Sequence, residues 1–317
     1  MKKASKVYGI TLILCVGVLF IKNQYTPILL KNATYGMPAL IEKGYVDNLY
    51  IGSSMFRQGL DIQTLNQNGE ENYILAYNGN QPTLEYLQLK HLLDNGVEIK
   101  NLYVDMYVYS AWEEPEISDE KIFMEVDLKK KWELWQLIAD KESTSWTDAW
   151  RIFVNSNNEV LLTWFIIYPI LNTQFLSGGT LLETAGSSYD TLTQMGVFGA
   201  EGEMNHMQKE AIQNITDLCK EYEINIMFIE TPKFETIIEN ESYINVIQKY
   251  CSVLQENEVS YVLLEETSNN VLLDGDDRSY TFDIKNADYF MDTIHLSSEG
   301  RVEFSEKIKS ERSYSGY

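Results

Sequence analysis

Short apolar runs alternate with amphipathic stretches along most of the chain. The runs are rich in β-branched and aromatic residues and are bounded by turn-forming residues, which is typical of buried strands. They predict five strands, at Val46–Ile51, Tyr73–Tyr77, Ile99–Val108, Ile224–Ile229 and Val259–Leu264. The intervening patterns predict helices at Met55–Leu65, Pro82–Asn95, Tyr243–Gln255 and Ser297–Ser310. Because parallel strands need crossover connections, this alternation predicts an α/β fold of three layers, with a parallel sheet of about five strands between helices.

Residues 112–205 interrupt this rhythm between the third and fourth strands. They hold all six tryptophans: Trp112, Trp132, Trp135, Trp146, Trp150 and Trp164. The same stretch contains a strongly apolar run at Val160–Leu171. We interpret residues 112–205 as a helical insertion, and two roles remain open for it. It forms either a lid or docking surface beside a site on the sheet, or a second small core.

The N-terminus has the pattern of an export signal. Lysines precede an uncharged run at Val7–Ile21, and Lys22 closes it. A helix of that length spans about 22 Å, less than a hydrocarbon core of about 30 Å, but flanking lysines can reach the interface. No clear small-residue cleavage site follows directly, so we favour an uncleaved signal-anchor at residues 1–22 over a cleaved signal peptide. The lysines place the N-terminus in the cytoplasm and the rest outside.

These features divide the chain into an anchor, a connector and one large domain. Residues 23–45 are expected to form a juxtamembrane connector, and residues 46–310 to form the α/β domain with its insertion. Residues 311–317 complete the chain as a polar tail. The expected location is therefore the cell membrane, with a single span and an extracytoplasmic C-terminal domain.

Charge and cysteine content exclude several classes of function. The chain has 25 basic and 47 acidic residues, and such an acidic surface repels nucleic acid. The three cysteines form no CxxC or Cys/His cluster, which argues against a structural zinc site. Cys219 and Cys251 could form one disulfide in an exported protein, although two buried thiols are the favoured alternative. The acidic loop Asp274–Asp277 lacks the final glutamate of a standard calcium loop, so no metal or other cofactor is expected.

Polar segments follow the ends of the predicted strands. In a parallel α/β sheet the carboxyl ends of all strands lie at one edge, where ligands bind. The segments expected there are Ser54, Asn78-Gly79-Asn80, Tyr107 with Tyr109, Thr231-Pro232-Lys233 and Asp292-Thr293-Ile294-His295. We therefore expect separate parts of the chain to meet at one rim.

Ser54, His295 and Asp292 are the candidate catalytic residues. A serine hydroxyl becomes a useful nucleophile when a histidine accepts its proton, and a carboxylate holds that histidine in the required tautomer. The three-residue spacing allows Asp292 to reach one ring nitrogen of His295 while the other faces outward. The two remaining histidines fit less well, because His91 is expected at the surface of a helix and His206 is expected to serve packing or capping.

The sequence resembles the SGNH (GDSL-type) hydrolase superfamily. The nucleophile block is matched by Ile51-Gly52-Ser53-Ser54, the second block by Gly79, and the closing block by Asp292-Thr293-Ile294-His295-Leu296 with Gly300. Ser53 stands where many members have Asp. The Gly-Ser-Ser form is similar to the membrane-anchored proteins of teichoic-acid D-alanyl transfer and alginate-type O-acetylation. The third block departs from the family, because Val104-Asp105-Met106-Tyr107 lacks the usual asparagine.

The resemblance implies a flavodoxin-like domain that hydrolyses or transfers an acyl group on an acylated envelope glycan or exopolysaccharide. The N–H groups of Ser54 and Gly79 would form the oxyanion hole, and the side chain of Asn78 or Asn80 would replace the missing amide. Expected partners are the polysaccharide or teichoic-acid-like substrate, the membrane and a membrane acyltransferase. The alternative is a catalytically degenerate domain that binds glycan or acts as a scaffold of an acyltransferase complex.

Overall fold

A parallel sheet forms the centre of the protein in the computed structural model, which describes residues 36–116, 133, 136, 184–196, 202–271 and 278–314. Within these residues the sheet has six strands in the order β2-β1-β3-β4-β5-β6, and all neighbours are parallel. The strands are β1 Tyr45–Gly52, β2 Asn72–Ala76, β3 Glu98–Asp105, β4 Asn225–Ile229, β5 Ser260–Leu264 and β6 Arg278–Tyr280. The α/β fold with a parallel sheet is therefore confirmed.

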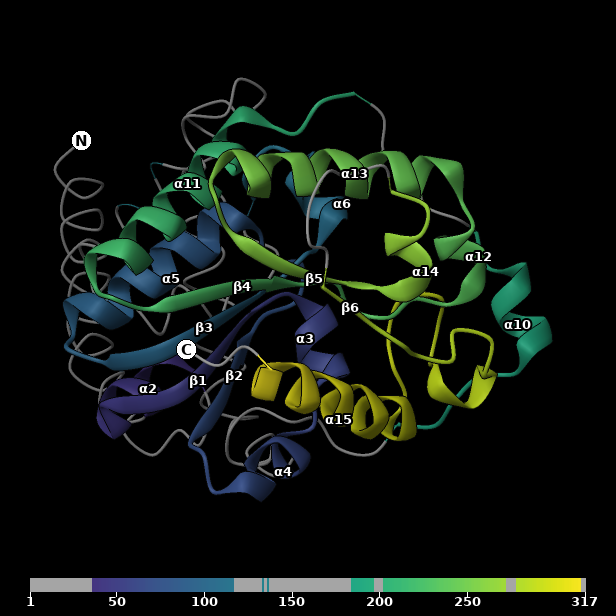
Figure 1. Cartoon of the computed structure of the whole chain (residues 1–317), viewed down its shortest axis with the longest axis horizontal. Helices are drawn as coiled ribbons and strands as arrows, with labels where there is room; N and C mark the ends of the chain where they lie inside the picture. Colours follow the sequence, from purple (N-terminus) through teal and green to yellow (C-terminus); the bar gives the residue numbers. More distant parts are fainter. Residues whose placement is uncertain are drawn as a thin grey trace, which may run out of the picture.

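Helices cover both faces of this sheet, as Figure 1 shows. One face carries α2 Met37–Lys43, α5 Pro82–Asp94, α6 Val108–Ala111, α11 His206–Glu221 and α13 Glu241–Glu256. The other face carries α3 Ser54–Gly59, α4 Ile62–Leu65 and α15 Ser298–Tyr314. The shorter elements are η1 Asn66–Asn68, α10 Tyr189–Gln194, α12 Glu235–Ile238, α14 Glu265–Ser268 and η2 Ala287–Tyr289.

Burial explains why the central strands read as continuous apolar runs. Leu49, Tyr50 and Ile51 of β1 are all buried, because helices cover both faces of the strand. The outer helices are amphipathic instead. In α11, Ile212, Ile215 and Cys219 recur on the buried side of the helix.

Several predicted boundaries were wrong. The sixth strand, β6, was not predicted, and β3 ends at Asp105 rather than at residue 108. The single helix predicted at 55–65 is two helices, because Leu60 is extended and Asp61 begins α4 by accepting a hydrogen bond from the Thr64 N–H. Within the expected connector at 23–45, residues 37–43 form helix α2.

Other predictions fall on residues outside the described part of the chain. These are the signal-anchor at 1–22, most of the insertion at 112–205 with five of its tryptophans, the acidic loop at 274–277 and the end of the polar tail. Among the described residues, no helix combines the length and apolar character needed to cross a membrane.

A ladder of asparagines crosses four strands of the sheet, at the first residue of β2 and β4 and about midway along β1 and β3. Asn225, Asn101, Asn48 and Asn72 occupy matching register positions on β4, β3, β1 and β2. Each side-chain amide donates to the next side-chain oxygen, at 2.9, 2.9 and 3.0 Å in that order. The ladder therefore fixes the register of these strands by side-chain bonds as well as by their backbones.

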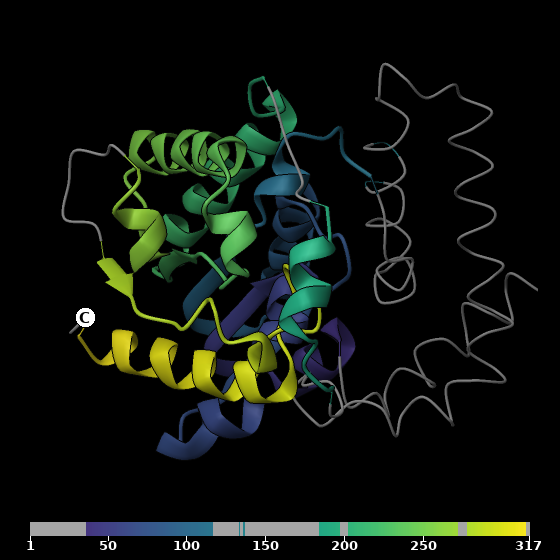
Figure 2. The ribbon, with the colours of Figure 1, turned by 90° about the vertical axis from the view of Figure 1, so that its right-hand side faces the viewer.

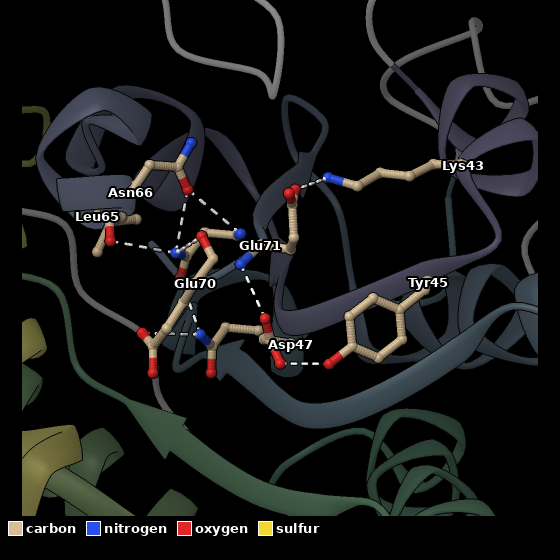
Figure 3. Close-up of polar contacts among 9 residues, drawn as sticks. Lys43, Tyr45, Asp47, Leu65, Asn66, Glu70 and Glu71 are labelled. Carbon is tan, nitrogen blue, oxygen red and sulfur yellow. Dashed lines mark hydrogen bonds and ion pairs between the residues drawn. The ribbon is translucent and has the colours of Figure 1, made fainter. Parts of the chain in front are cut away.

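Charged residues surround the β1–β2 end of this ladder, as Figure 3 shows. Asp47 accepts hydrogen bonds from the Tyr45 hydroxyl and from the Glu71 N–H, and Lys43 pairs with the Glu71 carboxylate. These side chains are largely exposed. Such surface pairs contribute little to stability, typically up to about 1 kcal/mol each.

Candidate active site

The turn after β1 presents Ser54 at the carboxyl edge of the sheet. Ser53 is the N-cap of α3, and its hydroxyl accepts a hydrogen bond from the Met55 N–H at 3.1 Å. Ser54 is the first residue of that helix and is only 8% exposed. Its side chain is therefore held at a strand-to-helix turn with little freedom.

Asp292 and His295 lie on a tight turn between β6 and α15. Isolated bridge pairing of Phe290 with Leu296 closes the turn. One carboxylate oxygen of Asp292 accepts hydrogen bonds from the N–H groups of Ile294 and His295, both at 2.9 Å. The carboxylate thus sets the shape of the turn that carries the histidine.

The structure brings the three predicted residues into one hydrogen-bonded chain. His295 Nδ1 lies 2.8 Å from the second carboxylate oxygen of Asp292, and His295 Nε2 lies 2.9 Å from Ser54 Oγ. A carboxylate can only accept a hydrogen bond, so Nδ1 carries the proton and Nε2 is left to accept from the serine hydroxyl. This is the arrangement that lets a histidine act as general base toward a serine.

The environment of Asp292 keeps its carboxylate charged. Burial alone would raise the pKa of Asp292, but the hydrogen bonds from the His295 ring and from the N–H groups of Ile294 and His295, with the charge on His295, outweigh it. The net effect is a lowered pKa. An ionised Asp292 can stabilise the imidazolium that forms when His295 takes a proton.

Asp105 holds the turn that carries Ser53 and Ser54, a role that sequence reasoning missed. One oxygen of its buried carboxylate accepts from the Ser53 N–H at 2.6 Å and from the Ser53 hydroxyl at 2.8 Å. Gly52 allows this contact, because an added Cβ would lie 2.4 Å from the same oxygen. A glycine ending one strand and an acid ending the neighbouring strand were the available signal. Asp105 was instead read only as the absence of an asparagine.

Burial dominates the electrostatics of Asp105. It raises the pKa of this carboxyl to about 6, although the hydrogen bonds from Ser53 and the charge of Lys233 act in the opposite direction. The pKa of Asp105 therefore lies closer to neutral pH than that of an ordinary aspartate.

The segment that follows the carboxyl end of β4 is buried. Lys233 is fully buried, donates a hydrogen bond to the Thr231 carbonyl at 2.9 Å and lies 5.2 Å from the centre of the Tyr243 ring. Glu230, also buried, accepts from the Leu264 N–H and from the hydroxyls of Thr267 and Tyr243. Thr231-Pro232-Lys233 thus follows the carboxyl end of a strand, as predicted, but its lysine side chain is buried.

The candidates for the oxyanion hole differ in whether their donor groups are already engaged in hydrogen bonds. Gly79 lies in the turn after β2 with a left-handed φ of 62°, which a glycine adopts readily. Asn80 is buried, and its side-chain NH₂ donates to the Gly52 carbonyl at 3.2 Å and to Gln88 Oε1 at 3.0 Å. Both of its amide hydrogens are thereby engaged. The exposed Asn78 remains the candidate side chain, and the roles of the Ser54 and Gly79 N–H groups stay predictions.

The two other histidines lie away from the triad. His91 is buried in α5, only 4% exposed, so its predicted surface position was wrong. His206 begins α11 as expected, but it is exposed, and the cap of the helix is Asn205. Neither contacts Ser54, Asp292 or His295 through the described bonds.

Of the remaining predicted residues, Tyr109 and the two cysteines are buried and Tyr107 is half-buried. Tyr107 and Tyr109 lie just beyond β3 with their ring centres 5.7 Å apart, and burial raises the pKa of Tyr107 to about 12. Cys219 and Cys251 are both buried free thiols, which confirms the favoured alternative to a disulfide. Among the described residues, no three His, Cys, Asp or Glu side chains are placed to hold a metal ion.

The chain was compared with known families, curated proteins and solved structures. No protein-family model matches the chain, and no curated protein matches it. Among solved structures, a proposed acylhydrolase from Bacteroides fragilis NCTC 9343 shares 11% identity, with a TM-score of 0.38, over 86% of this chain and 88% of that one. A GDSL-like lipase from Bacteroides thetaiotaomicron VPI-5482 shares 10% identity, with a TM-score of 0.38, over 93% of this chain and 98% of that one.

A third solved structure, described as a proposed platelet activating factor from Streptococcus pneumonia, is similarly distant. It shares 12% identity, with a TM-score of 0.40, over 96% of this chain and 98% of that one. Two of the three descriptions name the kind of protein that the sequence resembles. We infer the chemistry of this chain from its own parallel sheet and its hydrogen-bonded triad.

Proposed function

We propose that this protein cleaves or transfers acyl esters through Ser54, in the manner of an SGNH-type esterase or O-acyltransferase. The hydrogen-bonded chain from Asp292 through His295 to Ser54 carries the proposal. Ser54 attacks the ester carbonyl while His295 Nε2 takes the hydroxyl proton, forming a tetrahedral intermediate. His295 then gives the proton to the departing alkoxide, which leaves an acyl group on Ser54. Water or an acceptor hydroxyl releases that acyl group by the same steps in reverse.

The proposed substrate is an acylated glycan of the cell envelope or an exopolysaccharide, acted on outside the cytoplasm. The lysine-flanked apolar run at the N-terminus and the resemblance to membrane-anchored acyl-transfer proteins support this placement. Acetyl and D-alanyl esters are the acyl groups to test first. A membrane acyltransferase is the proposed donor partner if the reaction is a transfer.

Fluorophosphonate labelling of the full-length protein tests the chemistry. Wild type should be labelled. The labelling rate of Ser54→Ala and of His295→Ala should fall by about 10³-fold or more, because the first removes the attacking hydroxyl and the second removes the base that activates it. Ser252→Ala and His206→Ala, which alter exposed residues on other helices, are the matched controls and should label normally. Equal labelling of Ser54→Ala and wild type would refute the assignment.

A second candidate function is a degenerate domain that binds glycan or acts as a scaffold. It is favoured by one observation: β3 ends in Asp105 instead of an asparagine, and the nearby Asn80 amide is engaged by Gly52 and Gln88. Under this alternative, wild type binds the glycan but neither reacts with fluorophosphonate nor releases acetate from it. Acetate release that depends on Ser54 would exclude the degenerate domain.

A further inference from the structure

The turn that carries His295 does not belong to the sheet that carries Ser54. Its own bonds, namely the Asp292 carboxylate to Ile294 and His295 N–H and the Met291 N–H to the His295 carbonyl at 2.9 Å, fix its shape. They do not fix its position relative to α3. The 2.9 Å contact between His295 and Ser54 must therefore depend on what holds the turn from outside.

Residues 184–187, which we call the strap, bond to the chain on both sides of this turn. Before the turn, the Ser187 N–H donates to the Phe290 carbonyl at 2.7 Å, and the Ser187 hydroxyl donates to the Met291 carbonyl. After the turn, the Thr184 N–H donates to Ser298 Oγ at 2.7 Å, and the Ser298 N–H donates to the Thr184 carbonyl at 2.9 Å.

Gly186 sits at the closest approach of the strap to the turn segment. A Cβ added there would lie 2.4 Å from the Asp288 carbonyl oxygen, so any other residue would push backbone against backbone. Gly186 is not among the described glycines with a left-handed φ. Glycine is therefore required at this position by the close contact with Asp288, and not by the backbone conformation.

The helix that follows the strap braces the same region from a second direction. In α10 the Tyr189 hydroxyl donates to Glu235, and the Tyr189 ring meets the Phe234 ring edge-on at 5.5 Å. The Phe234 N–H in turn donates to the Thr293 carbonyl within the turn at 2.9 Å. Figures 1 and 2 show α10 beside the segment leading into α15.

We propose that the strap is a positioning element of the proposed reaction, in which Gly186 and Ser187 hold the Asp292–His295 turn so that His295 Nε2 reaches Ser54 Oγ. This inference rests on the proposed function. It assigns a role in the chemistry to a segment that belongs by sequence to the long connection between β3 and β4 and that contains no member of the triad.

Two pairs of matched variants of the full-length protein test the strap. Gly186→Ala should slow fluorophosphonate labelling by about 10- to 100-fold, because a displacement of about 1 Å costs that much in a positioned reaction. Gly196→Ala is its control, since a Cβ there meets no atom within 4 Å. Ser187→Ala should slow labelling by a smaller factor, about 3- to 10-fold. Ser252→Ala is its control, because this exposed serine lies on α13 and its hydroxyl bonds only the Gln248 carbonyl of the same helix.

Two further measurements separate positioning from general destabilisation. The downfield proton resonance of the His295–Asp292 hydrogen bond should shift or broaden in Gly186→Ala and stay in place in Gly196→Ala. Backbone hydrogen exchange should rise over residues 288–298 in Gly186→Ala while β1 and β3 keep their protection.

The outcomes distinguish the strap from the proposed function. The strap proposal is overturned if Gly186→Ala leaves both the labelling rate and the hydrogen exchange over 288–298 unchanged. It is also overturned if labelling slows but protection is lost equally throughout the sheet. If wild type is not labelled at all, the proposed function fails. Exchange over 288–298 then decides the strap alone, since a local rise supports it and no rise overturns it.

Discussion

The two edges of the sheet both gather polar side chains from several strands, but they use them differently. At the amino edge, where β2 and β4 begin, Asn48, Asn72, Asn101 and Asn225 form a ladder in which each amide donates to the next oxygen. At the carboxyl edge, the polar chain runs from Asp292 through His295 and reaches the Ser54 hydroxyl. Both are built from hydrogen bonds of ordinary length.

The difference lies in whether a proton can leave the network. Asparagine amides do not titrate, and their hydrogens serve neighbouring strands, so the amino edge can only hold the sheet together. The carboxyl edge contains the His295 imidazole, the Asp292 carboxylate and the hydroxyl of Ser54, a residue that is 8% exposed. Polar residues at strand ends therefore indicate a reactive site only when the set includes a group that can accept a proton and one that can attack.

The largest expected effect separates the edges by activity. Asp292→Asn should lower the labelling rate by on the order of 10³- to 10⁴-fold, because an amide in that position no longer selects the tautomer with Nε2 free to accept. The thermal unfolding temperature of the variant should stay close to that of wild type, so that the loss of labelling is not explained by unfolding. Asp288→Asn, an exposed neighbour, is the control and should label as wild type does. Asp292→Asn with full activity would show that the carboxylate is not the orienting group.

The next effect concerns pH and the buried carboxyl of Asp105. Its pKa in the folded protein, about 6, lies above its ordinary value of 3.8, so the folded state binds this proton more tightly than the unfolded chain. The resulting stabilisation is complete below about pH 4 and is lost as the pH rises through 6. Asp105→Asn keeps an acceptor for Ser53 but does not titrate. The free energy of unfolding of wild type relative to Asp105→Asn should therefore fall by about 2 kcal/mol between pH 4 and 7.

Denaturant unfolding at several pH values measures this difference. The exposed Asp190→Asn is the control, and it should follow wild type throughout. If wild type and Asp105→Asn show parallel pH dependence, Asp105 does not carry the shifted pKa.

A smaller effect should appear at the amino edge, in stability alone. Asn48→Ala removes the middle of the ladder, where the side chain bonds Asn72, Asn101 and Glu70. At about 1 kcal/mol for each buried bond, partly offset by bonds that Asn72 and Asn101 keep, the free energy of unfolding should fall by about 2 kcal/mol. Labelling of the folded variant should equal wild type, and the exposed Asn245→Ala should change neither property. Slower labelling of folded Asn48→Ala would show that the two edges are coupled.

Sequence reasoning found the parts of the molecule in which one local pattern dominates. Five strands and the serine, histidine and aspartate could be predicted because buried runs and strand-end turns are local signals. The three-residue β6 has too few residues to show a period, and only Tyr280 in it is buried. The break at Leu60 did have a signal, since Gly59 and the capping residue Asp61 flank it, but the apolar pattern across 55–65 concealed it.

Buried polar residues account for most of the remaining misses. Helix α5 packs against α2 and α11 as well as the sheet, so Thr83, Glu85, Gln88 and His91 are buried along with its leucines. A helix that is covered on several sides has no clear polar face, and His91 was therefore placed at the surface. Asp105 and Lys233 are similar, because their burial depends on neighbours that are distant in sequence.

The smallest expected effect concerns the thiols of Cys219 and Cys251. It tests whether a buried nucleophile with no histidine bonded to it is unreactive in the folded protein. Cys219 and Cys251 are at most 1% exposed, and burial raises the pKa of the Cys219 thiol to about 12. The thiolate is the reactive form, so neither thiol should react with a disulfide reagent such as Ellman's reagent while the protein is folded. The experiment uses Cys15→Ser full-length protein, which leaves only these two thiols. Both should react on unfolding in denaturant, and the same folded sample should still label at Ser54. If either thiol of the folded protein reacts as fast as an exposed cysteine, the packing of α11 and α13 against the sheet opens readily. Burial alone would then not explain why the thiols are less reactive than Ser54.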